Sequence, residues 1–523
     1  MNRGLAEILL VYGLTAAGVL VGLIWGGAPR SRLLRFPLTA IPIFIVAFIV
    51  VAILGDLFHY RLPQGPGLVN AILTCGFFFL FGSLAGRLLV RSAESVHQRG
   101  TLLDQSFRPF AGNSTQRKTL TLAGLPVAAP DETKHFKLIG TTGTGKSTVI
   151  RELLQGALGR GDRAVIADPD GSYLNRFYDA ARGDMILNPF EANAARWDLF
   201  AEMHTHYDAD QLAISLIPDT EGTERPWRGY ARVFLISLLR QLHRVKHDDV
   251  DELYRLLTTT PAEDLRELLA DTPAGPYLAQ DNGKFFGAVR AVANTHLSAL
   301  EHIARQTSCN RLSVRSWIQS GRGVGDSHRQ EGRGVLFLPY KANEIATLRS
   351  LISTWMRLAI YEAMNQSEGD QRLWFIIDEL DALGPIDGLK DALARLRKFG
   401  GRCVLGFQSI AQVSGTYGHA EAQTIVENCG NTLILRCSAS ERGGTSRFAS
   451  SLIGEREITR EHVTTNDGGG FFSRGHATTS RSLQHVTESA VMPSEIEQLP
   501  DLSGYLKFAS QPEWKRVNLR IQA

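Results

Sequence analysis

The stretch that decides the fold reads GTTGTGKST, from Gly140 to Thr148, and the short apolar run HFKLI precedes it. Gly140, Gly143 and Gly145 allow the backbone to curl so that successive N–H groups point at phosphate oxygens. The segment STVIRELLQGAL follows with apolar residues at helical spacing, which brings a helix N-terminus to the same point. A strand, a glycine loop and a helix in this order predict a phosphate-binding loop rather than a chance glycine turn.

The loop supplies nine candidate nucleotide-binding residues, and these are Gly140, Thr141, Thr142, Gly143, Thr144, Gly145, Lys146, Ser147 and Thr148. We expect Lys146 to reach the β- and γ-phosphates and to take part in catalysis. The Ser147 hydroxyl is expected to bind Mg²⁺. ATP and Mg²⁺ are therefore the expected cofactors.

A second motif, LWFIIDE, ends in Asp378 and Glu379. Open α/β sheets bind their ligands at the carboxyl ends of the strands, so we expect Asp378 to hold Mg²⁺ through water. Glu379 is the candidate base that orients and deprotonates the attacking water. An Asp-Glu pair also occurs as a plain strand-to-helix cap, but the phosphate loop favours the catalytic interpretation.

Two more residues are candidate catalytic groups. Gln408 ends the predicted strand CVLGFQS, where it could contact the γ-phosphate or the attacking water, or simply satisfy backbone groups. Arg397 lies with Arg395 and Lys398 on the helix before that strand, and it is a candidate to act in trans on a neighbouring subunit. A solvated helix face is the alternative for these three residues.

Weaker candidates lie in two other segments. Arg442, with Arg447 nearby, is a second basic candidate after the run NTLILRC. Asp168 belongs to the turn ADPDG, which either approaches the nucleotide or is only a turn.

The charge of the chain is unevenly distributed. Residues 1–100 contain eight Arg, no Lys and three acidic residues, a balance of +5, so the other 423 residues carry −2 of the overall +3. The soluble part is therefore not a basic body, and any nucleic acid must meet a local patch or a ring-lining surface. The five cysteines are scattered without C-x-x-C spacing, which favours a reducing compartment and no structural metal.

Three apolar runs, about 8–26, 36–54 and 68–90, are each near the ~20 residues that cross a bilayer as a helix. Arg30, Arg32 and Arg35 lie between the first two runs, so this loop should be cytoplasmic and the N-terminus outside. We expect residues 1–92 to be a multi-pass region of the bacterial inner membrane, with the ATPase in the cytoplasm. A two-span arrangement remains the alternative.

The remainder of the chain predicts an α/β fold with a helical insertion. Short apolar runs indicate a parallel sheet buried on both faces, and they are Phe136–Ile139, Ala164–Ala167, Met185–Leu187, Val335–Pro339, Leu373–Ile377, Cys403–Phe407 and Thr432–Arg436. Amphipathic helices replace strands over 199–309, which predicts an all-α domain between the nucleotide-binding parts 93–198 and 310–523. Residues 464–482 are rich in Gly, Thr and Ser, and they predict a long loop.

Taken in order, several motifs resemble the type IV secretion coupling proteins of bacterial conjugation, of the TraD/TrwB type. They are GTTGTGKST, VIADPDGSYLNRF, MILNPF with Trp197, SVRSWI (Ser313–Ile318), LWFIIDELDALGPI, GRCVLGFQS and LPDLSGYLKFA (Leu499–Ala509). The resemblance covers about residues 95–515. It implies a RecA-like P-loop NTPase core with N-terminal transmembrane helices, assembled as a homo-hexamer under the inner membrane.

The resemblance also implies a task and partners. The all-α domain would meet the relaxosome, and the motor would drive a relaxase with its single-stranded DNA into a type IV secretion channel, with double-stranded DNA as a further ligand. By position, Lys146 and Ser147 are the phosphate-loop pair, Asp378 and Glu379 the metal and water pair, Gln408 the glutamine of the third motif, and Arg397 the arginine acting in trans.

The chain departs from the family's pattern in its membrane part, because three apolar runs with short loops stand where two spans and a periplasmic loop are usual. Two other functions stay open. One is a duplex DNA translocase of the FtsK type, and the other is a membrane ATPase that acts as a receptor for protein export.

Overall fold

The computed structural model describes most of the chain in two units. The first unit comprises residues 1–99 with 457–487, and the second comprises 100–456 with 488–523. The described residues are 3–25, 33, 36–57, 68–89, 96–104, 120–219, 222–321, 334–365, 372–440, 444–466 and 478–521.

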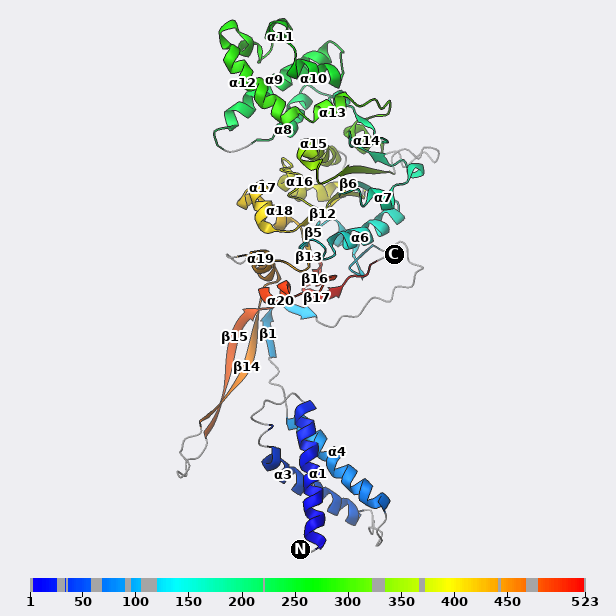
Figure 1. Cartoon of the computed structure of the whole chain (residues 1–523), viewed down its shortest axis with the longest axis vertical. Coiled ribbons are helices and arrows are strands. Elements are labelled where there is room, and N and C mark those ends of the chain that lie inside the picture. The colour runs from blue at the N-terminus through cyan, green and yellow to red at the C-terminus, as the bar shows by residue number, and fades with distance from the viewer. Residues whose placement is uncertain are drawn as a thin grey trace. The chain divides into compact units, whose positions relative to one another are not determined.

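A ten-stranded sheet lies at the centre of the second unit (Figure 1), in the order β2-β17-β16-β13-β5-β12-β11-β6-β10-β7. Seven strands match the predicted apolar runs and are parallel: β5 Phe136–Ile139, β6 Arg163–Pro169, β7 Met185–Ile186, β10 Val335–Tyr340, β11 Leu373–Ile377, β12 Gly401–Phe407 and β13 Asn431–Ile434. Antiparallel pairing adds β16 Ser503–Lys507 and β17 Glu513–Asn518, and β2 Leu102–Asp104 joins the edge. The prediction of an α/β fold with a parallel sheet is confirmed.

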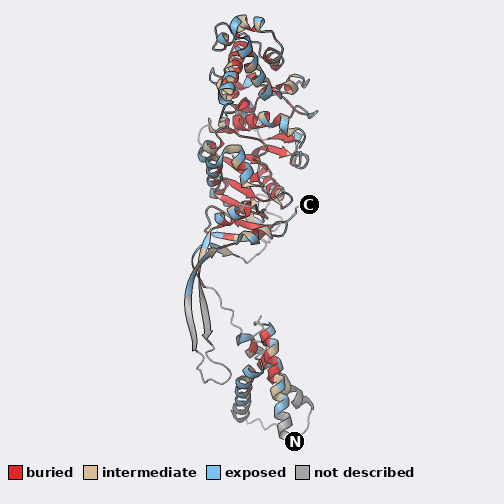
Figure 2. Ribbon diagram, turned by 60° about the vertical axis from the view of Figure 1, so that its left-hand side comes forward, coloured by how far each residue is buried: buried red, intermediate tan, exposed pale blue. Residues whose placement is uncertain are grey.

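Hydrophobic clusters cover both faces of this sheet, and Figure 2 shows the strands as mostly buried. Helix α6 (Lys146–Gly159) packs on one face against strand residues such as Leu138 and Trp374. Helix α15 (Ile345–Met364) covers the other face, where Trp355 is fully buried. Alternate residues of each strand therefore serve opposite cores, which explains why the strands read as continuous apolar runs.

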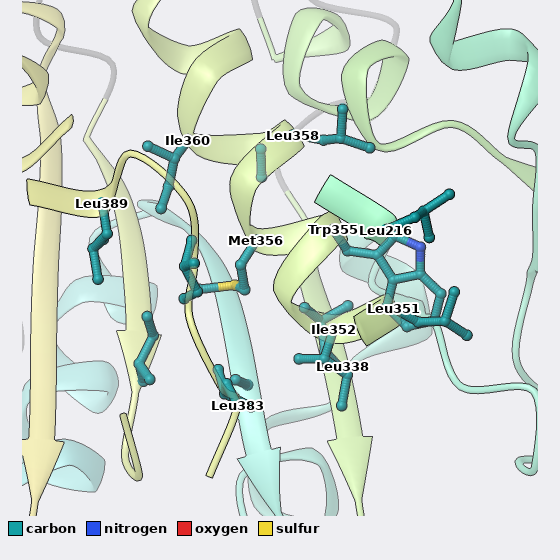
Figure 3. Packing of buried hydrophobic residues seen from close by; sticks show 14 of the residues in the cluster. Leu216, Leu338, Leu351, Ile352, Trp355, Met356, Leu358, Ile360, Leu383 and Leu389 are labelled. Carbon is teal, nitrogen blue, oxygen red and sulfur yellow. The ribbon is translucent and has the colours of Figure 1, made fainter. Parts of the chain in front are cut away.

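Strands β8 (Arg196–Trp197) and β9 (Arg311–Leu312) form a short parallel pair. The described residues between them form helices and 3-10 turns and contain no strand. The helices are α8 Asp208–Leu216, α9 Arg225–Arg244, α10 Val250–Thr258, α11 Ala262–Leu269, α12 Gly283–Leu297 and α13 Leu300–Ala304. Figure 3 shows Leu216 of α8 beside Trp355 of α15, so this segment and the sheet share one hydrophobic core.

The buried carboxylate of Glu202 connects the two ends of the helical segment, where the chain leaves the sheet and where it returns to it. Glu202 accepts hydrogen bonds from Trp197 Nε1 at 2.9 Å and from the backbone N–H of Val314 and Arg315 at 2.6 and 3.0 Å. Ser313 caps helix α14 (Val314–Ser320) and donates to the same carboxylate at 3.1 Å. The motif SVRSWI is thus explained by structure, because it supplies the helix N-terminus that holds Glu202.

Three apolar helices of the first unit coincide with the predicted membrane runs, and they are α1 Arg3–Trp25, α3 Phe36–Leu57 and α4 Leu68–Leu89. Among the residues that the structure describes, one segment, Ile8–Trp25, is long and apolar enough to cross a membrane. Phe36–Val51 and Thr74–Leu88 are shorter apolar helices. By this measure the structure supports the first of the three predicted spans.

Helices α1 and α4 approach each other through paired glycines spaced four residues apart. Gly18 and Gly22 of α1 face α4, and Gly82 and Gly86 of α4 face α1. A Cβ at any of the four would lie 2.1–2.5 Å from a backbone carbonyl oxygen of the facing helix. Such small-residue contacts are typical of helices that pack inside a bilayer.

The prediction of a long loop over residues 464–482 is wrong at both ends. Strand β14 runs over Glu455–Asn466 and strand β15 over Thr478–Ser489, and both belong to a three-stranded sheet with β1 (Val96–Gly100). The residues between these strands lie outside the part of the chain that the structure describes. Threonine favours strands as well as turns, so a Thr-rich composition did not distinguish a ribbon from a loop.

Candidate nucleotide-binding site

The phosphate loop lies at the carboxyl end of β5, directly before α6. Gly143 (φ 79°) and Gly145 (φ 117°) adopt left-handed conformations that favour glycine. Gly140 is needed for a different reason, because a Cβ there would meet Leu435 Cβ and Thr144 Oγ1 at 2.8 Å. The loop therefore has the curled backbone that its sequence predicts.

Lys146 folds back over the loop and is 7% exposed. Its Nζ donates to the carbonyl oxygens of Gly140 at 2.6 Å and Thr141 at 3.3 Å. Burial lowers the pKa of Lys146, while the carboxylates of Asp378 and Glu379 oppose that shift. The ammonium group is thus held by the phosphate loop, and the acidic pair stabilises its charge.

Asp378 follows β11 and brings the second motif to the phosphate loop. Ser147 Oγ donates to Asp378 Oδ2 at 2.8 Å, and Tyr173 OH donates to the same oxygen at 2.7 Å. The other oxygen, Oδ1, is buried and has no hydrogen-bond partner among the described residues. A bare carboxylate oxygen beside a serine hydroxyl fits Mg²⁺, which prefers hard oxygen ligands and retains several waters.

Glu379, Gln408 and Thr142 form a chain of side-chain contacts. Gln408 Nε2 donates to Glu379 Oε1 at 2.9 Å, and Thr142 Oγ1 donates to Gln408 Oε1 at 2.8 Å. Burial, and then the neighbouring Asp378, raise the pKa of Glu379, which suits a general base. The phosphate loop, the second motif and the third motif therefore meet in one site.

Asp168 lies one strand away from Asp378, since Ile377 pairs with Ala167. Its carboxylate accepts the backbone N–H of Tyr173 at 3.0 and 3.1 Å and that of Leu174 at 2.7 Å. Burial raises the pKa of Asp168 to about 6. The carboxylate of Asp168 thus stabilises the turn before helix α7 (Leu174–Phe177).

Arg397 lies at the opposite, amino-terminal ends of the parallel strands. The 3-10 turn Arg397–Phe399 follows helix α16 (Leu389–Leu396) and precedes β12, whereas Gln408 follows β12. A strand of seven residues separates these ends by about 20 Å. Arg397 therefore does not reach the phosphate loop of its own chain.

Arg397 lines a cavity of about 270 Å³, whose lining includes five basic residues and one glutamate. The lining residues are Ala129, Glu132, Thr133, Arg160, Arg372, Arg397, Lys398, Gly400 and Arg402. Glu132 accepts from Arg160 at 2.7 and 2.6 Å and from Arg402 at 3.0 Å. The cavity therefore keeps a positive balance.

The structure describes one of the two other basic candidates. Arg447 is exposed on helix α19 (Gly444–Ile453), and Arg442 lies outside the described residues. Tyr173, in contrast, was not predicted from the sequence, although it contacts Asp378 directly. The local sequence does not mark it, because a tyrosine between Ser172 and Leu174 after a turn is an ordinary core residue.

The parallel sheet, the phosphate loop and the acidic pair at the strand ends define a RecA-like P-loop NTPase core. The model of the type IV secretion-system coupling protein DNA-binding domain matches residues 119–520. The chain belongs to this family of coupling proteins.

Relatives and solved structures agree with this family. The coupling protein TraD of Escherichia coli (strain K12) is 30% identical over 450 residues, which is 85% of this chain and 61% of TraD. The coupling protein VirD4 of Bartonella henselae is 25% identical over 253 residues, or 48% of this chain and 35% of VirD4. The chain thus spans less than two thirds of the length of each of these relatives.

Structures of the plasmid coupling protein TrwB have the same fold. An unbound form of TrwBdeltaN70 superposes with a TM-score of 0.69 at 31% identity and covers 82% of this chain and 94% of that one. A complex of TrwB with ADP and Mg²⁺ gives a TM-score of 0.68 at 31% identity over the same shares. The prediction of a RecA-like coupling protein is confirmed.

Proposed function

We propose that this chain is a membrane-anchored ATPase that couples the relaxosome to a type IV secretion channel. It drives single-stranded DNA with its relaxase through that channel during conjugation. The observation that carries the proposal is the meeting of three motifs through the Ser147–Asp378 and Glu379–Gln408 contacts. Membership of the coupling protein family supplies the context.

The proposed ligand is ATP with Mg²⁺. A TrwB structure with ADP and Mg²⁺ and one with the ATP analogue ADPNP, both 31% identical to this chain, support this choice. The backbone N–H groups of the loop and Lys146 bind the phosphates, while Ser147 and Asp378 would hold Mg²⁺, which would neutralise phosphate charge when bound. Glu379 orients and deprotonates the attacking water, and Gln408 links that water to Thr142 of the loop.

Arg397 acts in trans in this proposal. Its place at the amino-terminal ends of the strands, on a cavity of positive balance, suits contact with a nucleotide held by a neighbouring subunit. An arginine supplied in this way accelerates hydrolysis by about 10³–10⁵-fold in P-loop NTPases. This role requires a neighbouring subunit, and we propose that the subunits form a homo-hexameric ring.

The DNA ligand is proposed to lie along the axis of the ring. The soluble part of the chain carries −2, so six copies of one or two basic side chains suffice to line a pore without wrapping DNA tightly. Binding to a single strand should then weaken with salt, with a slope of about −0.7 per phosphate contacted. We propose that the helical domain, residues 199–309, receives the relaxosome, between nucleotide-binding parts 93–198 and 310–523.

The anchor is proposed to be residues 1–92 in the bacterial inner membrane. Helix α1 is the span that length and composition support, and the glycine contacts between α1 and α4 favour α4 as its partner in the bilayer. With α3 as a further span, the loop with Arg30, Arg32 and Arg35 faces the cytoplasm.

The alternatives receive less support. The matched relatives are coupling and conjugal transfer proteins, which favours conjugation over a duplex translocase of the FtsK type or a receptor for protein export.

The test is ATP turnover of the detergent-solubilised full chain at low salt, alone and with single- or double-stranded DNA. We expect hydrolysis that single-stranded DNA stimulates and that Lys146→Thr abolishes. Turnover that neither form of DNA changes would contradict the proposed motor. Stimulation by duplex DNA alone would favour the FtsK-type function instead.

A further inference from the structure

We propose that Tyr173 is a positioning residue for the Mg²⁺ site, because its hydroxyl fixes the carboxylate of Asp378 toward the metal. The inference rests on the proposed ATPase function and adds a residue to it.

The hydroxyl of Tyr173 is built into the site. The side chain is 0% exposed and belongs to the core cluster that packs on α6. The guanidinium of Arg151, on α6, lies 6.0 Å from the centre of its ring. The ring is thus held by packing, and its OH lies 2.7 Å from Asp378 Oδ2. Hydrogen bonds from a hydroxyl to a carboxylate are short and strong, so this contact constrains the acidic group.

The two oxygens of Asp378 differ in their surroundings. Oδ2 accepts from both Ser147 and Tyr173, whereas Oδ1 is buried without a partner among the described residues. Ser147 is itself a proposed ligand of Mg²⁺, so its hydroxyl is needed at the metal. Tyr173 is then the donor that continues to hold Oδ2, and it keeps Oδ1 directed to the metal and its waters.

Asp168 holds the backbone of Tyr173 in place. Both of its oxygens accept the backbone N–H of Tyr173, and one also accepts that of Leu174. Because β6 and β11 are neighbouring strands, the turn that carries Tyr173 is fixed to the strand beside Asp378. The segment ADPDGSY therefore acts on the metal site through Tyr173 rather than through Asp168. Groups behind metal ligands typically change metal affinity by about 10–100-fold when they are removed.

The test uses Tyr173→Phe, which removes the hydroxyl and keeps the ring. Affinity for a fluorescent ADP analogue is measured on the full chain in detergent, once across a series of Mg²⁺ concentrations and once in EDTA. We expect the Mg²⁺ concentration that gives half of the metal-dependent gain in affinity to rise about tenfold. Affinity in EDTA should stay within about twofold of wild type, because the phosphate loop is unchanged.

Tyr178→Phe is the matched control. Tyr178 lies five residues further on, is 45% exposed, and its ring contacts Phe337 rather than the acidic pair. It should behave as wild type. Asp168→Asn is a second variant, and because it weakens the support of the turn, it should shift the Mg²⁺ dependence in the same direction.

Two outcomes overturn the inference. Wild-type Mg²⁺ dependence in Tyr173→Phe would show that the hydroxyl does not position Asp378. Equal losses of affinity in Mg²⁺ and in EDTA would show that Tyr173 only maintains the fold. Both differ from failure of the proposed function, in which the wild-type chain itself binds no nucleotide or does not hydrolyse ATP.

Discussion

The hydroxyl of Ser147 and the carboxylate of Asp378 lie 2.8 Å apart, although 231 positions separate the two residues in the chain. The contact joins the first turn of α6 to the end of β11. It depends on the sheet order β5-β12-β11 of parallel strands, which brings the phosphate loop and both later motifs together at the carboxyl ends of these strands. Because these strands are parallel, Arg397, in the turn before β12, lies at the opposite, amino-terminal ends of the strands.

The position of Arg397 predicts complementation between subunits. Arg397→Ala and Glu379→Gln should each lower ATP turnover by at least about 10²-fold, since each site loses either its arginine in trans or its base. Mixed rings of the two variants contain some sites with both groups intact, so turnover should recover on mixing. The measurement is ATPase activity after the two purified variants are co-assembled.

Arg395→Ala is the control for this experiment, because Arg395 is also exposed and lies two residues earlier on α16. It should keep near wild-type activity. Mixed rings that stay as inactive as either variant alone would contradict a role of Arg397 across the subunit boundary.

The glycine contacts of the anchor predict a sharp difference between two positions on α1. Gly22→Leu would place a Cβ 2.1 Å from the Ser83 carbonyl oxygen, whereas a Cβ at Gly13 meets nothing within 4 Å. Overpacking of this kind costs about 1–3 kcal/mol. We expect Gly22→Leu to lower the thermal stability of the anchor in detergent and Gly13→Leu to leave it unchanged. Equal stability of the two variants would mean that α1 and α4 do not pack in this way.

A buried histidine predicts a loss of stability in mild acid. His135 is 2% exposed, its Nε2 contacts the Leu393 carbonyl at 2.8 Å, and its Nδ1 accepts from the Cys403 N–H at 3.1 Å. Burial lowers the pKa of His135 to about 4. The folded state therefore keeps this ring neutral while the unfolded chain takes up a proton below about pH 6.5. Its contribution to stability is complete above that pH and is lost as the pH falls towards 4.

His135→Gln removes this titration and keeps an amide that can donate and accept. From pH 7 to pH 5, the wild-type chain should lose about 2 kcal/mol more of its free energy of unfolding than the variant, at ~1.4 kcal/mol per pH unit. Chemical denaturation at both pH values measures the difference, with the half-exposed His243→Gln as control. The idea fails if His135→Gln loses as much stability as the wild type.

The sequence predicted the parts of the site whose residue types the chemistry dictates. Glycines at 140, 143 and 145 and the acidic pair after LWFII rarely occur together outside a nucleotide site, so Lys146 and Asp378 could be assigned without knowing the sheet order. Contacts between distant strands could not be predicted in this way. Tyr173 meets Asp378 only because β6 lies next to β11, and no local pattern encodes that adjacency.

Composition misled the prediction in one place. The Thr- and Gly-rich segment after Thr464 was assigned to a loop, yet β14 and β15 extend over Glu455–Asn466 and Thr478–Ser489. Pairing with a neighbouring strand decides between turn and strand for such residues, and pairing is not visible in one local window. Helical patterns in residues 199–309 were easier to interpret, because amphipathic periodicity repeats over many turns.

The most direct test of the central claim is transfer frequency from donors that carry Glu379→Gln, with ATP turnover measured on the same protein. We predict that turnover and transfer are both lost, while the variant still binds ATP and inserts into the membrane. Glu427→Gln, the same change at an exposed residue on α18 (His419–Asn428), should leave both intact. Transfer at the wild-type frequency by a Glu379→Gln protein that no longer hydrolyses ATP would contradict the account.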